Sequence, residues 1–316
     1  MAEKMATRDA YGDILAQLGE ENEKIVVLDA DLSKSTKTVV FAKKFPHRFF
    51  NMGIAEGDML GTAAGLAAAG KIPFASTFAV FATGRAFDQI RNSIAYPRLN
   101  VKIAATHAGL TVGEDGGSHQ AVEDIAIMRA IPGMVVIVPA DGVSTKALVT
   151  AAVNYQGPVY IRLGRPAVPL LYKEDEEFVI GKAKELRDGK DFTIVAAGIM
   201  VAKALEAAEI LAAEGIRTRV LDMHTIKPLD EEALERAARE TGGIVTVEEH
   251  SVIGGLGSAV AEFVAETHPV PVIRVGIQDV FGESGKPDEL LEKYGLTVEK
   301  IVEAVKRLKN NTAAGL

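Results

Sequence analysis

The sequence predicts an α/β protein with two doubly wound domains, each built on a mainly parallel sheet. Short apolar runs alternate with helical segments along the chain, an order typical of parallel strands covered by helices on both faces. The alternation stops near residue 164 and resumes at residue 192. The length of 316 residues also exceeds what one compact core usually spans. These observations favour two domains over one.

The first domain is predicted to cover residues 1–170. We expect strands at 24–28, 74–77, 101–105, 134–138 and 159–163, and helices at 9–18, 59–69, 85–95, 121–130 and 145–154. Residues 107–120 are rich in glycine and polar side chains, which predicts a loop.

The pattern changes after the last of these strands. Two prolines and an acidic cluster follow, and we assign residues 171–190 to an inter-domain linker. The second domain is predicted over residues 191–316. It should contain strands from 192 and at 218–222, 244–247 and 272–275, with helices at 201–214, from about 230, at 254–265 and at 298–308.

The composition is that of a globular protein, with 48% hydrophobic and 25% charged residues. A net charge of -8 argues against nucleic acid or an anionic membrane as the main partner. The absence of cysteine excludes disulfides, thiol nucleophiles and Cys-ligated metals. The sequence shows neither a secretory signal pattern nor an apolar run long enough to cross a bilayer. We therefore expect a cytoplasmic enzyme or enzyme subunit.

Polar runs follow three of the predicted strands in the first domain. They are DADLSKS, THAGLTVGEDGGSHQ and GRP. Ligands of doubly wound sheets bind at the carboxyl ends of the strands. Three such runs in one domain therefore indicate a composite site.

Glu56 lies among small and apolar neighbours in NMGIAEGDMLGTAAGLA, which suggests a buried carboxyl group. Burial raises the pKa of a carboxyl group, so that it can be protonated or share a proton near neutral pH. Taken alone, Glu56 is better explained as a helix cap or a surface residue.

The other candidates also have ordinary explanations. Asp115 and His119 could form a solvated turn, and His107 could be structural. Arg8, Ser35 and Arg165 could be caps or ion-pair partners, although the proline after Arg165 holds that residue extended, as an anion clamp requires. Phe78 and Phe81 could form a core stripe or a platform for a flat ring.

The sequence gives little support to a hydrolase, a zinc site or a dinucleotide site. The sequence contains no GxSxG motif and no HExxH motif, which argues against a hydrolase nucleophile and against a zinc site, and we predict no metal ligands. Gly254–Gly257 resembles part of a dinucleotide turn, but the rest of that motif is missing.

The ordered motifs carry a family resemblance over nearly the whole chain. DADLSKST, NMGIAEGDMLGTAAGLA, TFAVFATGRAFDQIR, THAGLTVGEDGGSHQ and RLGRP resemble the pyrimidine-binding domain of transketolases. VLDMHTIKPLD, VEEH and GGLGSAV resemble the C-terminal domain that transketolases share with deoxyxylulose-phosphate synthases and 2-oxoacid dehydrogenase β subunits.

A third transketolase domain is not represented. The GDG…N motif that holds the diphosphate and a divalent metal in full-length transketolases is absent. The chain thus resembles the C-terminal subunit of a split transketolase. The resemblance implies thiamine diphosphate as cofactor and an N-terminal partner subunit that carries the diphosphate and Mg²⁺ site. It also implies self-association, in an α₂β₂ assembly, and sugar phosphate substrates of a two-carbon transfer.

The resemblance assigns a role to each candidate residue. Glu56 matches the glutamate that hydrogen-bonds N1′ of the cofactor's aminopyrimidine and activates it, and we expect Glu56 and His119 to be catalytic. Phe78 and Phe81 match the aromatic wall against the pyrimidine, and Asp31 matches an acid near the cofactor. Asp115 and His119 match contacts to the donor sugar hydroxyls. The residues that match the group gripping the sugar phosphate are Arg8, Ser35, His107 and Arg165.

Two positions depart from the family pattern. Gly84 stands where many transketolases carry an aromatic residue near the pyrimidine, and Gly117 replaces a common proline. Alternatives remain a β subunit of a 2-oxoacid dehydrogenase, a subunit of a deoxyxylulose-phosphate-synthase-like enzyme, and a non-catalytic scaffold or regulatory subunit. The polar set around GEDGGSHQ favours a sugar phosphate over a 2-oxoacid.

Overall fold

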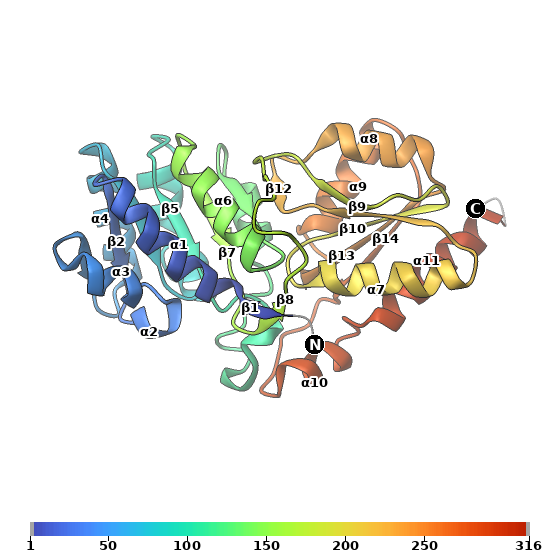
Figure 1. Cartoon of the computed structure of the whole chain (residues 1–316), viewed down its shortest axis with the longest axis horizontal. Coiled ribbons are helices and arrows are strands. Elements are labelled where there is room, and N and C mark those ends of the chain that lie inside the picture. The colour runs from blue at the N-terminus through green and yellow to red at the C-terminus, as the bar shows by residue number, and fades with distance from the viewer. Residues whose placement is uncertain (1–2, 314–316) are drawn as a thin grey trace.

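The computed structural model of the chain describes residues 3–313, which form two lobes side by side (Figure 1). The first lobe is built on a seven-stranded sheet and the second on a five-stranded sheet. A small antiparallel pair, β1 (Lys4–Ala6) and β8 (Ala167–Pro169), brings the two ends of the first lobe together. Both large sheets are mainly parallel, which confirms the predicted fold class.

The first sheet has the strand order β12-β6-β7-β5-β4-β2-β3. Its strands are β2 (Ile25–Asp29), β3 (Phe49–Asn51), β4 (Ile72–Ser76), β5 (Lys102–Ala105), β6 (Val135–Ile137), β7 (Val159–Arg162) and β12 (Thr225–Lys227). All neighbours are parallel except β12 and β6. The carboxyl ends of β2, β4, β5 and β7 therefore meet at one edge.

Helices cover both faces of this sheet. The helices are α1 (Thr7–Glu21), α3 (Val39–Lys44) and α6 (Gly142–Asn154) on one face, and α4 (Glu56–Ala68), α5 (Asp124–Ala130) and the π-helical η3 (Gln89–Ala95) on the other. In β2, Ile25 and Val27 pack in the core with α1, whereas Val26 and Leu28 pack in the core with α4. Because both faces are buried, the strand is apolar throughout rather than alternating.

The second sheet has the order β14-β13-β10-β11-β9. Its strands are β9 (Lys184–Arg187), β10 (Phe192–Ala196), β11 (Thr218–Asp222), β13 (Ile244–Ser251) and β14 (Val272–Ile277). Helices α7 (Met200–Ala213) and α11 (Val298–Ala313) pack in the core on one face, while α8 (Glu231–Glu240) and α9 (Leu256–Glu266) contribute to a core shared with the first domain. Helix α10 (Pro287–Lys293) lies against the first lobe near residues 110–115.

Three local predictions differ from the structure. The region in which a helix was expected at 85–95 holds two π-helical segments, η2 (Phe81–Arg85) and η3, a rare helix type that an apolar pattern alone does not predict. The loop at 107–120 contains a 3₁₀ helix, η4 (Leu110–Asp115). The expected linker contributes β9, a polar edge strand without an apolar signal. The domain boundaries themselves stay a prediction.

Strand β12 physically joins the two domains. It comes from the second half of the chain, yet it pairs antiparallel with β6 at the edge of the first sheet. Nearby, the Val138 amide donates to the His224 carbonyl at 2.8 Å. The first sheet is therefore completed by the second domain.

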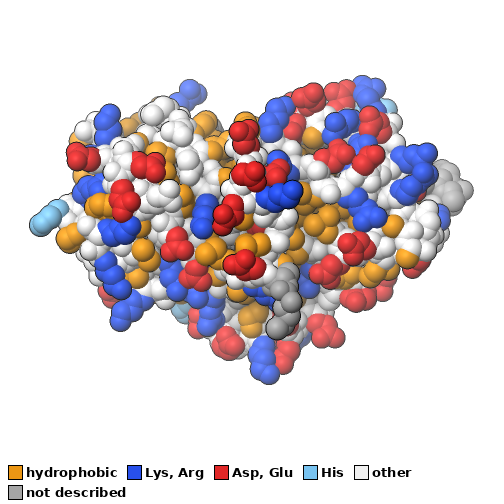
Figure 2. Space-filling model, in the orientation of Figure 1, with side chains coloured by type: hydrophobic (Ala, Val, Ile, Leu, Met, Phe, Trp, Pro, Cys, Tyr) orange, Lys and Arg blue, Asp and Glu red, His pale blue; other side chains and the backbone are white. Residues whose placement is uncertain are grey.

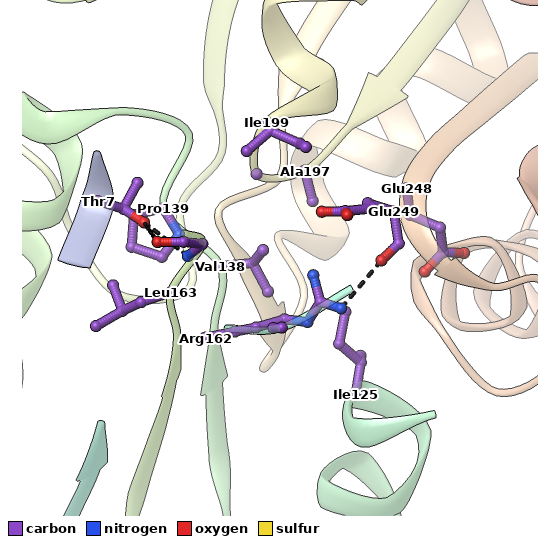
Figure 3. Close-up of a pocket in the computed structure, with 13 residues that line it drawn as sticks. Thr7, Ile125, Val138, Pro139, Arg162, Leu163, Ala197, Ile199, Glu248 and Glu249 are labelled. Carbon is purple, nitrogen blue, oxygen red and sulfur yellow. Dashed lines mark hydrogen bonds between the residues drawn. The ribbon is translucent and has the colours of Figure 1, made fainter. Parts of the chain in front are cut away.

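A buried ion pair lies at the same boundary. Arg162, at the end of β7, donates from Nε to the Asp124 carboxylate at 2.8 Å and from Nη2 to the Glu249 carbonyl at 3.0 Å. Figure 3 shows Arg162 pointing from the first domain toward Glu249 of the second, beside a small cavity between them. Burial alone would raise the pKa of Asp124, but the charge of Arg162 and hydrogen bonds from Arg162 and Tyr160 hold it below its ordinary value.

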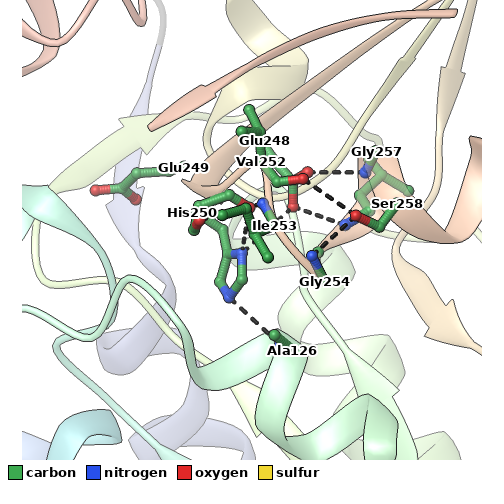
Figure 4. A network of polar contacts seen from close by, with 12 residues as sticks. Ala126, Glu248, Glu249, His250, Val252, Ile253, Gly254, Gly257 and Ser258 are labelled. Atoms are coloured by element: carbon green, nitrogen blue, oxygen red, sulfur yellow. Dashed lines mark hydrogen bonds and ion pairs between the residues drawn. The ribbon is translucent and has the colours of Figure 1, made fainter. Parts of the chain in front are cut away.

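The neighbouring side chains of β13 extend this contact (Figure 4). The Glu248 carboxylate accepts the amides of Leu256 and Gly257, at the start of α9, at 2.7 and 2.8 Å. Burial raises the pKa of Glu248 to about 7. His250 accepts the Ala126 amide of α5 on Nε2 at 3.4 Å. Three consecutive residues of β13 thus fix α9 and bind the first domain.

The surface in Figure 2 carries charges of both signs over both lobes, with a notch between them. On this face Lys and Arg side chains are interspersed with Asp and Glu. No helix within residues 3–313 is long and apolar enough to cross a bilayer.

We predict that Arg162→Met lowers the free energy of unfolding by about 3–5 kcal/mol, because it leaves the Asp124 carboxylate buried without its counter-ion. Urea denaturation of the purified chain would measure the loss. The double variant Arg162→Met, Asp124→Asn should lose less than the single one, since no unpaired charge remains. An equal or greater loss in the double variant would contradict this account.

Candidate active site

The predicted site residues come from separate elements that meet at the carboxyl edge of the first sheet. Asp31 follows β2, Phe78 follows β4 and His107 follows β5. Arg165 follows β7, and Glu56 is the first residue of α4. This is the edge at which ligands bind in doubly wound sheets.

The Glu56 side chain is 5% exposed, as its small neighbours Gly57 and Ala55 suggested. Its Oε1 accepts a hydrogen bond from Arg85 Nη1 at 3.0 Å, while Arg85 itself is half exposed. The first turn of a helix favours a negative charge through its unpaired amides. Glu56 is therefore a buried carboxyl group, and the half-exposed Arg85 shows that a polar group from the surface can reach its Oε1 atom.

A continuous aromatic wall lies beside this carboxyl group. The rings of Phe78 and Phe81 are stacked with centroids 5.8 Å apart, and His107 stacks on Phe78 at 3.9 Å. The His119 ring meets Phe81 edge-on at 5.2 Å. Phe78 is buried, whereas Phe81 is partly exposed. The partly exposed Phe81 is the member of the wall that a flat heteroaromatic ring could pack against, although the Arg85 guanidinium lies over its ring at 4.0 Å.

Positively charged side chains, which include Arg8 and Arg165, lie around His107 and are called the cationic group below. Arg8 Nη1 donates to His107 Nε2 at 3.2 Å and lies 3.1 Å from the Ser35 carbonyl. Because arginine cannot accept, Nε2 must be the acceptor and the ring proton must sit on Nδ1, which donates to Thr106 Oγ1 at 2.8 Å. Burial, together with the charges of Arg8 and Arg165, lowers the pKa of His107 to about 3.

Arg8 carries the features of an anion-binding arginine. Burial and the nearby charge of Arg165 lower the pKa of Arg8, although Asp9 acts in the opposite direction. Its Nε is buried and lacks a hydrogen-bond partner among residues 3–313. A buried donor without a partner is costly, and an anionic ligand beside Arg8 and Arg165 would relieve the repulsion between their charges.

Arg165 reaches the loop after β5. It donates to the Val112 carbonyl and to Glu114 Oε2 at 3.3 Å, and it lies 3.9 Å from Asp115 Oδ2. Asp115 and Arg165 are therefore neighbours, as the shared site requires. Ser35 enters through its backbone carbonyl, so the role of its hydroxyl group stays a prediction.

Asp31 lies farther along the sheet edge, toward β3. Its carboxylate accepts from Asn51 Nδ2 at 3.1 Å, and Asn51 Oδ1 accepts the Asp31 amide at 3.1 Å. Within residues 3–313 these contacts tie Asp31 to Asn51 rather than to the aromatic wall. Its φ of 62° is a left-handed conformation, which His107 shares at 57°. Such backbone strain often occurs at functional sites.

Three site residues were missed from the sequence. Arg85 binds Glu56, Lys37 adds positive charge near His107, and Glu249 accepts the Thr111 amide at 2.7 Å and so holds the loop from the second domain. At Gly109, where φ is 80°, a side chain would collide with the Glu249 carboxyl group. Arg85 lay inside a quoted motif, but no pattern pairs residues 29 positions apart.

The described residues hold no obvious metal site. Among residues 3–313, no group of three or more His, Asp or Glu side chains is placed to bind an ion. The site offers a carboxyl group, an aromatic wall and a cationic group, which suit a flat organic ring and an anionic substrate.

Comparison with known proteins identifies similar chains. Residues 3–169 match the family described as transketolase, pyrimidine binding domain, and residues 181–301 match transketolase, C-terminal domain. A solved structure described as a split gene transketolase, inactive β4 tetramer, is 63% identical, with a TM-score of 0.91 over 96% of this chain and 98% of that one.

Two curated relatives differ in length. A putative transketolase C-terminal section of Methanocaldococcus jannaschii is 56% identical over 94% of both chains. Human transketolase is 42% identical over 98% of this chain but only 50% of its own length. The chain thus corresponds to a whole protein in one relative and to half of another.

We predict that the His107 ring stays neutral, with its proton on Nδ1, between about pH 5 and pH 8. Because the folded pKa of about 3 lies below the ordinary 6.5, the unfolded chain takes up the proton first. The stability that His107 contributes is therefore complete above pH 6.5 and is lost as the pH falls toward 3. Long-range ¹H–¹⁵N NMR spectra would report the ring state, and a titration midpoint near 6.5 would show the assignment to be wrong.

Proposed function

Because the chain belongs to the transketolase family, we propose that it is the C-terminal subunit of a thiamine-diphosphate-dependent transketolase that moves a two-carbon unit between sugar phosphates. The observation that carries the proposal is the buried carboxyl group of Glu56 beside the Phe78–Phe81 wall, at the same sheet edge as the cationic group around His107.

The residues fit the cofactor's aminopyrimidine. The exposed part of Phe81 offers a stacking surface, and the buried carboxyl group of Glu56 can exchange a proton with N1′ of the ring. When bound, thiamine diphosphate supplies the nucleophile and the electron sink for breaking and making the carbon–carbon bond. Glu56 would hold the ring in the reactive tautomer, and Asp31 would lie near the cofactor at a subunit boundary.

The remaining residues would bind the sugar. Asp115 and His119 would contact hydroxyl groups of the donor, with His119 also placed to move a proton. Arg8 and Arg165 would hold the terminal phosphate together with Ser35, and His107 would take part through its contact with Arg8. A neutral His107 suits this role, because its Nε2 already orients Arg8 and adds no charge that would repel it.

A partner subunit is part of the proposal. The chain spans about half of human transketolase, and that similarity supports a separate N-terminal subunit for the diphosphate and Mg²⁺. The similar solved protein is described as an inactive tetramer of β chains, as expected for one kind of subunit alone. We further propose a cytoplasmic heterotetramer with active sites at subunit boundaries.

The alternatives make different demands on the site. A 2-oxoacid dehydrogenase β subunit would need no paired arginines for a sugar phosphate, and a scaffold would need no buried carboxyl group beside an aromatic wall. The arrangement of Arg8, Arg165 and Glu56 therefore supports an active transketolase subunit.

The decisive experiment combines the chain with an N-terminal transketolase subunit, thiamine diphosphate and Mg²⁺. We expect two-carbon transfer from xylulose 5-phosphate, and at least a roughly hundredfold slower rate for Glu56→Gln with assembly intact. Decarboxylation of a 2-oxoacid without sugar transfer would refute the proposal. Near-normal activity of Glu56→Gln would remove Glu56 from the mechanism.

Arg165→Ala should raise KM for phosphorylated sugars by roughly tenfold to a hundredfold, the loss of one charge-assisted hydrogen bond. KM for an unphosphorylated ketose should change little. Steady-state kinetics on both substrates measures the difference. The exposed Arg91, which contacts Asn92, provides the control variant Arg91→Ala. An equal effect on both sugars would rule out a phosphate contact.

A further inference from the structure

Arg85 contacts both the aromatic wall and the buried carboxyl group of the site. Its guanidinium group lies 4.0 Å from the centroid of the Phe81 ring, and its Nη1 donates to Glu56 Oε1 at 3.0 Å. One planar group therefore stacks on the aromatic wall and hydrogen-bonds the buried carboxyl group. These are the two contacts that the proposed function requires of the aminopyrimidine ring.

The chemistry of the two groups is closely matched. A guanidinium is flat and delocalised, stacks on aromatic faces and donates N–H bonds to carboxylates. An aminopyrimidine is also flat and also presents nitrogen atoms along one edge. The Phe81 face under the Arg85 guanidinium cannot carry both groups at once, and Arg85 also uses the Glu56 oxygen on that side.

The surroundings allow Arg85 to leave. The Arg85 side chain is 52% exposed, whereas Glu56 is 5% exposed. Arg85 is the last residue of η2, and the exposed Gly84 before it has open space where a side chain would lie. Because the arginine side of the ion pair is half exposed, its guanidinium can move into solvent when a ligand competes for the carboxyl group.

From these contacts we propose that Arg85 competes with the aminopyrimidine ring for Glu56 and Phe81, and that it swings away when the ring binds. This inference rests on the proposed function. Before the ring binds, Arg85 neutralises the buried Glu56 carboxylate, which has no other counter-ion among residues 3–313. The apparent affinity for the cofactor is then reduced by the fraction of molecules in which Arg85 covers the site.

The test measures thiamine diphosphate affinity of the complete complex by equilibrium dialysis, without turnover. Arg85→Met keeps an unbranched apolar stem but removes the guanidinium. We expect its Kd for the cofactor to fall by about three- to tenfold, because the competing contact is lost. Arg91→Met removes the same charge from an exposed arginine that contacts Asn92, and its Kd should match the wild type.

A second variant guards against a folding defect. Arg85→Lys keeps the charge but not the planar fork, so its Kd should lie between those of the wild type and Arg85→Met. Weaker or unchanged binding in both Arg85 variants would overturn the inference and make Arg85 a fixed partner of Glu56. If the wild-type complex binds no thiamine diphosphate, the proposed function fails first, and this inference fails with it.

Discussion

The buried ion pair between Arg162 and Asp124 connects three segments that are far apart in the sequence. Arg162 ends a central strand, Asp124 begins α5, and the Glu249 carbonyl that Arg162 also binds belongs to the second domain. A buried charge must be paired and hydrogen-bonded, so the position of each segment depends on the others. Together with the pairing of β12 and β6, this contact fixes the orientation of the two domains through buried interactions.

The contact between the domains also positions a loop of the candidate site. Glu249 binds the Thr111 amide, and Gly109 leaves room for its carboxyl group. The loop between β5 and α5, which carries Asp115 and His119, is therefore held by the second domain as well as by the first. This gives the residues in VEEH a structural role that the sequence left open.

Much of the site could be named from the sequence because motif order carries strong information. Glu56, Phe78, His107 and Arg165 all lie at the expected sheet edge, where the alternation of strands and helices places them. The ion pair between Arg85 and Glu56 was not predictable, since no local pattern pairs residues 29 positions apart. The edge strand β9 was missed for a related reason, because half-exposed strands need few apolar residues.

The sequence by itself determined the fold class, the family and the types of side chain available to the site. Local periodicity and ordered motifs encode these properties, because they depend on residues close together in the chain. Only the tertiary structure decided which side chains touch: the neutral state of His107, the pairing of Arg85 with Glu56 and the interlocking of the domains through Arg162. These depend on burial and on contacts between residues up to 99 positions apart, which no local pattern records.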